Sequence, residues 1–262
     1  MNSIRQEEIL SFAKELAVRG GKVAERYFGK VSPSYKADNT PVTEADRAVE
    51  DFIVSEITKR YPDHSILGEE GTEMISDLAG PLWVIDPLDG TSAFSQFLPI
   101  WGVSVGFFSE HRPLAGAFYA PLLDDLYTAT ADGPARCGSA ELHLDPSPRI
   151  DSNSMMLVSS DFHHYVRNRF PGNARALGSI AADICYVARG GGVAAVSGTV
   201  KAWDLGAAML ILERAGGSFR YLDGSPLEAR DLLEERSTRG LFVAAHESVI
   251  SRIAGYIQIV KP

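Results

Sequence analysis

Two aspartates, separated by two residues, directly follow a short apolar run in the first half of the 262-residue chain. The run Leu82–Ile85 leads into the segment DPLDGT (residues 86–91), a pattern typical of a buried strand that enters a tight turn. Asp86 and Asp89 can then direct their carboxylates at one point, where they repel each other unless a divalent cation lies between them. An Asp-Gly pair is also an ordinary turn signal, but the strand before it and Thr91 after it favour a metal site.

The same turn offers groups that suit a phosphate. The backbone carbonyl of Leu88 stands between the two aspartates in the sequence and is a candidate third oxygen ligand. The N–H groups of Gly90 and Thr91 follow the turn, where backbone donors make a natural seat for an anion. The segment therefore predicts a combined site for a cation and a phosphate.

Acids elsewhere in the N-terminal half have two interpretations each. Glu69 and Glu70 are bracketed by glycines, which by itself indicates a solvated loop. Asp46 lies three residues after Thr43, so it suits the acidic position of a helix capping box and a metal ligand equally well.

The C-terminal half holds two further acids at expected helices. Asp204 follows Trp203 at the start of one helix, where N-capping is the commoner role of an aspartate. Its alternative is to reach a cation from the opposite lobe. Asp183 lies within an earlier helix, and its position indicates a solvated or capping residue.

Hydrophobic periodicity predicts the elements that must position these residues. An amphipathic helix covers Ile9–Tyr27, and a second helix begins after Thr43 and ends before Pro62. Alternating apolar residues after Pro99 predict an antiparallel meander. Strands and helices then interleave, which implies layered α/β packing; the expected elements are strand Met155–Val158, helix Ser179–Arg189, strand Val193–Val196, helix Asp204–Ala215, strands Ser218–Leu222 and Gly240–Ala244, and helix Glu247–Ile257.

A stretch rich in Gly, Pro, Asp and Ser at residues 132–152 predicts a boundary between two lobes. The N-terminal lobe, residues 1–145, would carry most of the candidate ligands. The C-terminal lobe, residues 146–262, would supply Asp204 and substrate contacts.

Charge and composition exclude several classes of function. The chain has 25 Lys and Arg against 34 Asp and Glu, a formal charge of −9, which disfavours nonspecific binding to nucleic acid or to anionic membranes. A small anionic substrate would need a cation between itself and the protein. Two separated cysteines and no long apolar run predict a soluble, cytoplasmic protein without a membrane partner.

Four segments together resemble a known family. They are PVTEAD (41–46), GEE (68–70), WVIDPLDGT (83–91), and the pair Trp203-Asp204 followed by ERAGG (213–217). In this order they are similar to the inositol monophosphatase family of lithium-sensitive, Mg²⁺-dependent phosphatases, from about residue 5 to residue 260. The resemblance implies an α+β fold layered as an αβαβα sandwich, with the active site between two lobes and usually a homodimer. It also implies hydrolysis of a small phosphorylated metabolite.

The resemblance assigns roles to the candidate residues. It implies two to three Mg²⁺ ions, held by oxygen ligands from both lobes: Glu69, Asp86 and the Leu88 carbonyl for the first, Asp86, Asp89 and Asp204 for the second, and Asp46 with Glu69 for a third, weaker site. The catalytic residues would be Thr91, Asp46 and Glu69, with Thr91 and Asp46 orienting and deprotonating the attacking water. The amides of Gly90 and Thr91 would bind the phosphate.

Departures from the family pattern concern the substrate. Ser197 stands where animal-type members hold a Glu that contacts inositol hydroxyls, and Ala93 and Gln96 replace a frequent Asn and His. Inositol 1-phosphate or a similar polyol or sugar phosphate is the expected substrate. Histidinol phosphate, fructose 1,6-bisphosphate, NADP and 3′-phosphoadenosine 5′-phosphate are alternatives. The bisphosphate and the nucleotides would need extra cations, for which Arg167, Arg169, Arg175, Arg189 and Lys201 are available.

Two non-hydrolase interpretations stand beside the phosphatase. A non-catalytic binding protein of the same fold would have lost a metal ligand or Thr91, and none is lost. A calcium-binding structural module would show EF-hand spacing, which is absent from the sequence.

Overall fold

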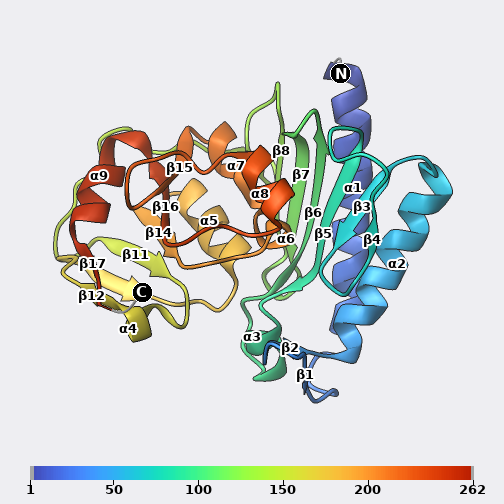
Figure 1. Cartoon of the computed structure of the whole chain (residues 1–262), viewed down its shortest axis with the longest axis horizontal. Helices are drawn as coiled ribbons and strands as arrows, with labels where there is room; N and C mark the ends of the chain where they lie inside the picture. Colours follow the sequence, from blue (N-terminus) through green and yellow to red (C-terminus); the bar gives the residue numbers. More distant parts are fainter. Residues whose placement is uncertain (1–2, 261–262) are drawn as a thin grey trace.

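The N-terminal half of the computed structural model, which describes residues 3–260, is a large sheet covered on one face by two long helices (Figure 1). The helices are α1 (Ser3–Glu25) and α2 (Glu44–Arg60). Eight strands in the order β10-β9-β8-β7-β6-β5-β3-β4 form the sheet: β3 (Ser65–Gly68), β4 (Glu73–Met74), β5 (Leu82–Asp89), β6 (Gly102–Ser109), β7 (Arg112–Ala120), β8 (Asp125–Thr130), β9 (Arg136–Cys137) and β10 (Ala140–Glu141). The short pair β1 (Ser34–Tyr35) and β2 (Pro41–Val42), helix α3 (Thr91–Ser95) and the 3₁₀ turn Pro121–Leu123 complete this half.

The C-terminal half is built on a five-stranded sheet in the order β13-β11-β14-β16-β15. Its strands are β11 (Met155–Val158), β13 (Asn173–Arg175), β14 (Ala194–Ser197), β15 (Gly217–Tyr221) and β16 (Phe242–His246). Its helices are α5 (Ile180–Ala188), α6 (Ala202–Leu205), α7 (Ala208–Arg214), α8 (Ala229–Glu235) and α9 (Glu247–Gly255). The short α4 (Phe162–Tyr165) and the pair β12 (Val166–Asn168) and β17 (Ile257–Ile259) lie at its edge.

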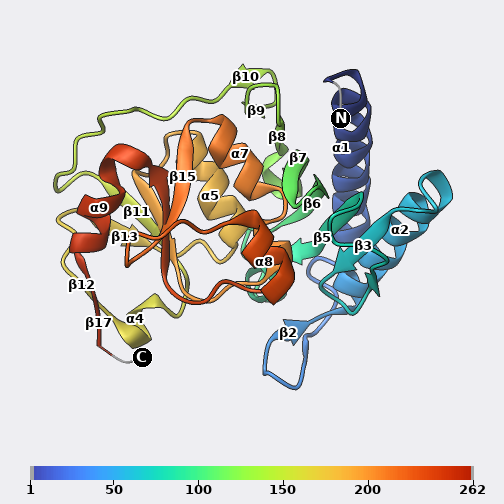
Figure 2. The same ribbon diagram turned by 45° about the horizontal axis from the view of Figure 1, so that its top comes forward.

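The layers alternate as the sequence predicts. Helices α1 and α2 pack on the outer face of the large sheet (Figure 2), and α6 and α7 pack on its inner face (Figure 1). Helices α5 and α7 also contact the small sheet, whose other side is covered by α9. The αβαβα sandwich is therefore confirmed. Because helices cover both faces of β5, all eight of its residues are buried, as its continuous apolar run requires.

Two glycines of the large sheet allow the α6–α7 junction to lie close against that sheet. A Cβ atom added at Gly106 on β6 would lie 2.3 Å from the carbonyl oxygen of Gly206, and one at Gly116 on β7 would lie 2.9 Å from that of Ala207. The backbones of the inner helices thus rest directly on the large sheet. This contact brings Asp204 on α6 toward the strand that carries Asp86 and Asp89.

Several local predictions are confirmed and others need correction. Thr43 caps α2, which ends at Arg60 before Pro62, and β6, β7 and β8 form the expected antiparallel meander. The single helix predicted over Asp204–Ala215 is wrong, because the chain turns at Gly206 into two short helices, α6 and α7.

The chain passes from the large sheet to the small sheet between Glu141 and Met155. The lobe boundary at 145/146 stays a prediction. Within residues 3–260, none of the helices combines the length and the hydropathy needed to cross a membrane.

Candidate active site

The central turn of the site is built by a strand that continues further than its apolar run. The sequence predicts that the strand ends before Asp86, but β5 extends to Asp89, with an irregularity in its register against β6 between these two residues. Gly90 then adopts φ 94°, and a Cβ atom there would lie 3.1 Å from the carbonyl oxygens of both Gly178 and Ile100. Only glycine combines that backbone conformation with so little space. The chain can therefore start α3 at Thr91 directly after the acids.

Asp46 fills the capping position predicted for it at the start of α2, while its role as a metal ligand stays a prediction. Its Oδ2 accepts hydrogen bonds from the Thr43 amide at 2.8 Å and the Thr43 hydroxyl at 2.6 Å, which completes a capping box. Its Oδ1 accepts a hydrogen bond from the Thr91 hydroxyl at 2.8 Å. Asp46 is fully buried, and burial raises the pKa of its carboxyl. The capping contacts thus fix a carboxylate whose second oxygen faces the central turn.

Asp89 is held from the opposite half of the molecule. Its Oδ2 accepts hydrogen bonds from the Ser179 hydroxyl at 2.6 Å and the Ala181 amide at 2.7 Å, both at the N-terminus of α5. Burial raises the pKa of Asp89 to about 6 even though these donors favour its charged form. Ser179 also caps α5 through the Ala182 amide. One serine therefore starts a helix and links that helix to the central strand.

Lys36 is the cation that contacts the Glu69–Glu70 pair. Its Nζ lies 3.0 Å from Glu69 Oε1 and 2.7 Å from Glu70 Oε1. Burial alone would lower the pKa of Lys36, but the two glutamates raise it. Burial raises the pKa of Glu70 to about 7 despite the lysine. The solvated-loop interpretation of this pair is therefore wrong, because both acids are half-buried and both contact Lys36.

Negative charge accumulates around Asp86. Its Oδ1 accepts a hydrogen bond from the Leu88 amide at 3.0 Å, and the residue is 1% exposed. Burial, and then the charges of Glu69, Asp89 and Asp204, raise its pKa well above the ordinary value. Asp204, half-buried on α6, has its pKa raised by desolvation, Asp89 and Glu69. The pKa values of Asp86 and Asp204 are therefore raised by burial and by the neighbouring carboxylates, and the hydrogen bonds that favour the charged forms do not offset this effect.

The donor set suits a hard divalent cation. Carboxylates and a backbone carbonyl are the oxygen ligands that Mg²⁺ prefers, and a cation would relieve the repulsion among the buried acids. Within residues 3–260, no three His, Cys, Asp or Glu side chains already stand in an arrangement that could hold a metal ion. Lys36, Ser179 and the Lys201 amide bind several of the carboxylate oxygens instead. A cation would have to replace part of these hydrogen bonds.

A cavity of about 370 Å³ opens beside Asp89 and Asp204. Residues of both halves line it: Thr40, Asp89, Ser159, Ser160, Asp161, Tyr165, Gly178, Ser179, Ile180, Asp183, Ser197, Gly198, Thr199, Val200 and Asp204. Ser197 lines the cavity, whereas Ala93 and Gln96 are not part of this lining. The sequence interpretation of Asp183 is wrong, because its side chain is buried rather than solvated and makes no capping contact.

Comparison with known proteins decides the family. Residues 5–258 match the model of the inositol monophosphatase family. The chain belongs to the inositol monophosphatase family. The inositol-1-monophosphatase of Mesorhizobium japonicum is 30% identical over 257 residues, which cover 93% of each chain.

Two further relatives span nearly the whole chain. The fructose-1,6-bisphosphatase/inositol-1-monophosphatase of Aquifex aeolicus is 29% identical over 273 residues and covers 97% of this chain and 98% of its own length. The solved structure of the Thermotoga maritima IMPase shares the fold, with a TM-score of 0.83 at 24% identity over 95% of this chain and 96% of that one. Members of the inositol monophosphatase family are metal-dependent enzymes, generally with Mg²⁺, that hydrolyse phosphate monoesters. This protein is a phosphatase of that family.

The sequence predicts the main acids of this inositol monophosphatase family member and the Thr43–Asp46 capping box, but it does not predict that Ser179 and Lys36 bind these acids. The sequence predicts Ser179 as the start of a helix and assigns no role to Lys36. Spacing gives no signal for Lys36 or Ser179, because each meets its acid across a long stretch of chain. The PVTEAD segment did signal Thr43, whose hydroxyl and amide both bind Asp46.

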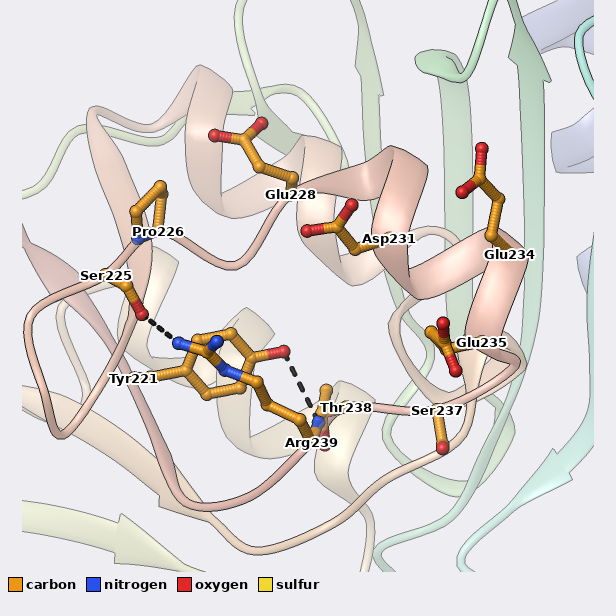
Figure 3. A pocket seen from close by; sticks show the side chains of 10 residues that line it. All are labelled: Tyr221, Ser225, Pro226, Glu228, Asp231, Glu234, Glu235, Ser237, Thr238 and Arg239. Carbon is orange, nitrogen blue, oxygen red and sulfur yellow. Dashed lines mark hydrogen bonds between the residues drawn. The ribbon is translucent and has the colours of Figure 1, made fainter.

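A larger cavity, about 540 Å³, lies elsewhere in the C-terminal half and contains none of the predicted site residues (Figure 3). Four exposed acids line it: Glu228, Asp231, Glu234 and Glu235. Arg239 lies over the ring of Tyr221, 4.3 Å from its centroid, and donates a hydrogen bond to Ser225 (Figure 3). Exposed acids remain hydrated, so this cavity offers no reason to collect a cation.

Proposed function

We propose that the protein hydrolyses a small phosphate monoester, inositol 1-phosphate or a similar polyol or sugar phosphate, with Mg²⁺ bound at the buried acids. The observation that carries this proposal is the hydrogen bond from Thr91 Oγ1 to Asp46 Oδ1 beside the buried acids of β5. A hydroxyl held against a buried carboxylate at the end of a strand is suited to activating water.

The proposed ligands follow the chemistry of their oxygens. Glu69, Asp86 and the Leu88 carbonyl would hold one ion, Asp86 would share a second with Asp89 and Asp204, and Asp46 with Glu69 would contribute to a third. Bound Mg²⁺ supplies positive charge that attracts the phosphate dianion and neutralises charge developing on the phosphoryl oxygens. The amides of Gly90 and Thr91, which have no partner within α3, would orient the phosphate.

Proton movement is assigned to two residues. Thr91 Oγ1 lies 2.8 Å from Asp46 Oδ1 and 3.0 Å from the Leu88 carbonyl oxygen. It would accept a hydrogen bond from the attacking water while it donates its own hydrogen to Asp46. As water attacks phosphorus, the P–O bond to the ester oxygen breaks, the water proton passes to Thr91 and the Thr91 proton passes to Asp46. The departing alkoxide takes a proton from solvent water, and Asp46 releases its proton to solvent, which restores the starting state. The Thr43 contacts on Oδ2 keep the other carboxylate oxygen of Asp46 directed at Thr91.

The lining of the 370 Å³ cavity favours a substrate with a single phosphate. Of the described residues that line it, none is Lys, Arg or His. The five cations considered for a second phosphate, Arg167, Arg169, Arg175, Arg189 and Lys201, are absent from that lining. A bisphosphate or nucleotide would place a second anion against Asp161 and Asp183. A neutral polyol would meet hydroxyls such as those of Ser197 and Tyr165.

A phosphate-release screen tests the proposal. Purified protein is incubated with inositol 1-phosphate, histidinol phosphate, fructose 1,6-bisphosphate, NADP and 3′-phosphoadenosine 5′-phosphate, with Mg²⁺, with a chelator, and with Mg²⁺ plus Li⁺. Mg²⁺-dependent release that is fastest from inositol 1-phosphate is expected. Preference for a bisphosphate would reject the substrate, and metal-independent release would reject the mechanism. Sizing by light scattering tests the homodimer that we also propose.

A further inference from the structure

Asp183 is a buried acid for which the mechanism above has no use. It is 2% exposed, and its Oδ1 has no hydrogen-bond partner within the described part of the chain. A buried polar oxygen without a donor costs free energy, so such groups are rare unless something else binds them. Asp183 also lines the 370 Å³ cavity beside Asp89 and Asp204. Its side chain is therefore placed where a ligand could supply the missing donor.

The position of Asp183 on α5 relates it to the reaction centre. Its amide donates to the Ser179 carbonyl at 3.0 Å, so it lies one helical turn after the serine that holds Asp89. Residues one turn apart share a helix face. Asp183 thus lies on the cavity wall next to the contact between Ser179 and Asp89.

Neighbouring polar groups of the cavity are already partnered. The Tyr165 hydroxyl donates to Asp161 Oδ1 at 2.9 Å and lies 3.2 Å from the Ser159 hydroxyl. Gly198 keeps space beside this tyrosine, since a Cβ atom there would lie 2.6 Å from the Tyr165 oxygen. Asp183 differs from these groups because its free oxygen is enclosed and unpaired.

We propose that Asp183 is a specificity-determining residue that accepts a hydrogen bond from a hydroxyl or a protonated amine on the alcohol half of the substrate. The inference rests on the proposed function and deepens it by assigning the side chain that recognises the leaving group. A substrate donor would satisfy the unpaired oxygen, whereas a second phosphate would meet a carboxylate without a cation. Discrimination between esters then depends on donors in the leaving group rather than on its size.

Matched pairs of esters separate this recognition from the chemistry of hydrolysis. Inositol 1-phosphate is compared with cyclohexyl phosphate, which keeps the ring and loses the hydroxyls. Aminoethyl phosphate is compared with ethyl phosphate, which loses the amine. The kcat and KM values of the wild type, Asp183→Ala and Asp183→Asn are measured with saturating Mg²⁺. Asp231→Ala, at an exposed acid of the other cavity, is the control.

Asp183→Ala is expected to reduce the preference for the donor-bearing ester about tenfold, mainly through KM, as for loss of one hydrogen bond to a charged group. Asp183→Asn keeps an acceptor oxygen, so it should retain most of the preference for a hydroxyl and lose that for an amine. The preference that Asp183→Asn retains therefore shows whether Asp183 accepts a hydrogen bond from a hydroxyl or from an amine. Asp231→Ala should leave the preference unchanged.

Thermal unfolding distinguishes recognition from a structural role. Because the buried oxygen is unpaired, Asp183→Ala should unfold at or above the wild-type temperature. A lower Tm together with equal losses for both members of each pair would overturn the inference. So would a wild type with Mg²⁺-dependent activity but no preference for donor-bearing esters. Absence of hydrolysis of every ester would overturn the proposed function and the inference together.

Discussion

Two acidic regions of this molecule differ in burial far more than in the number of acids. Around β5, Asp46, Asp86 and Asp89 are almost fully buried, and desolvation raises the pKa of each. In the cavity of Figure 3, four acids line the wall and all are exposed. Water solvates the second group, whereas the first can relieve its repulsion only through protons, through Lys36 or through bound cations. Burial, not acidity, separates a candidate metal centre from a charged surface.

Cavity size does not identify the candidate metal centre. The exposed acidic cavity is the larger, about 540 Å³ against about 370 Å³. Of these two cavities, the smaller one is lined by a buried acid that accepts a hydrogen bond from the other half of the molecule, Asp89 from Ser179. The comparison therefore predicts that substitutions of buried acids affect catalysis and substitutions of exposed acids do not.

The largest effect is expected at Asp86. Asp86→Asn removes one charge from the proposed shared ligand in the buried cluster, and kcat/KM should fall about 1,000-fold, the upper range for losing a group that stabilises transition-state charge. Asp231→Asn, in the exposed cavity, should change kcat/KM less than about twofold. Phosphate release from inositol 1-phosphate measures both. Similar losses in the two variants would remove the distinction between the regions.

Thr91 should rank second. Thr91→Ala removes the hydroxyl that donates to Asp46 at 2.8 Å, and kcat should fall about 100-fold, the lower range for general acid–base catalysis. Thr91→Ser restores the hydroxyl and should recover activity to within about tenfold of the wild type. Equal losses in the alanine and serine variants would show that the threonine methyl, and not its hydroxyl, is what the site requires.

A smaller effect is expected at Ser179, which links the two halves. Ser179→Ala removes the 2.6 Å hydrogen bond to Asp89 and the cap of α5. The Mg²⁺ concentration for half-maximal activity should rise about tenfold, as for loss of a group that orients a ligand. Loss of the cap should lower the free energy of unfolding by about 1 kcal/mol. A variant with that destabilisation but an unchanged Mg²⁺ requirement would limit Ser179 to a structural role.

The smallest effect is a pH dependence of stability at Glu70. Its native pKa of about 7 exceeds the ordinary 4.5, so the folded state binds the proton more tightly than the unfolded chain. This contribution is full below about pH 4.5 and is lost as the pH rises through about 7. Urea unfolding of chelator-treated protein should show Glu70→Gln flattening this decline. Glu235→Gln, at an exposed acid, should leave the decline as in the wild type, and a flattening there would contradict the comparison.

Much of this arrangement could be predicted from the sequence, for definite physical reasons. The buried run before DPLDGT required a covered strand, and the interleaved strands and helices required layers, both of which the fold confirms. Local spacing also predicted the Thr43 cap of α2. These predictions hold because each depends on residues that are neighbours in the chain.

What the sequence could not predict depends on contacts across the fold. The burial of Asp183 follows from packing α5 between the sheets, and its own neighbours in the sequence carry no sign of it. Lys36 reaches Glu69 and Glu70 from a polar loop more than thirty residues away. The break at Gly206 arises where the inner helices press on Gly106, a contact with no local signature.

Calorimetric titration of Mg²⁺ into the substrate-free protein tests the central claim most directly. Wild type, Asp86→Asn and Asp231→Asn are compared at pH 7.5, with thermal unfolding to verify that each variant is folded. Saturable binding by the wild type and by Asp231→Asn, together with loss of that binding in Asp86→Asn, is the predicted result. Full binding by Asp86→Asn, or loss of binding in Asp231→Asn, would contradict the assignment of the metal centre to the buried acids.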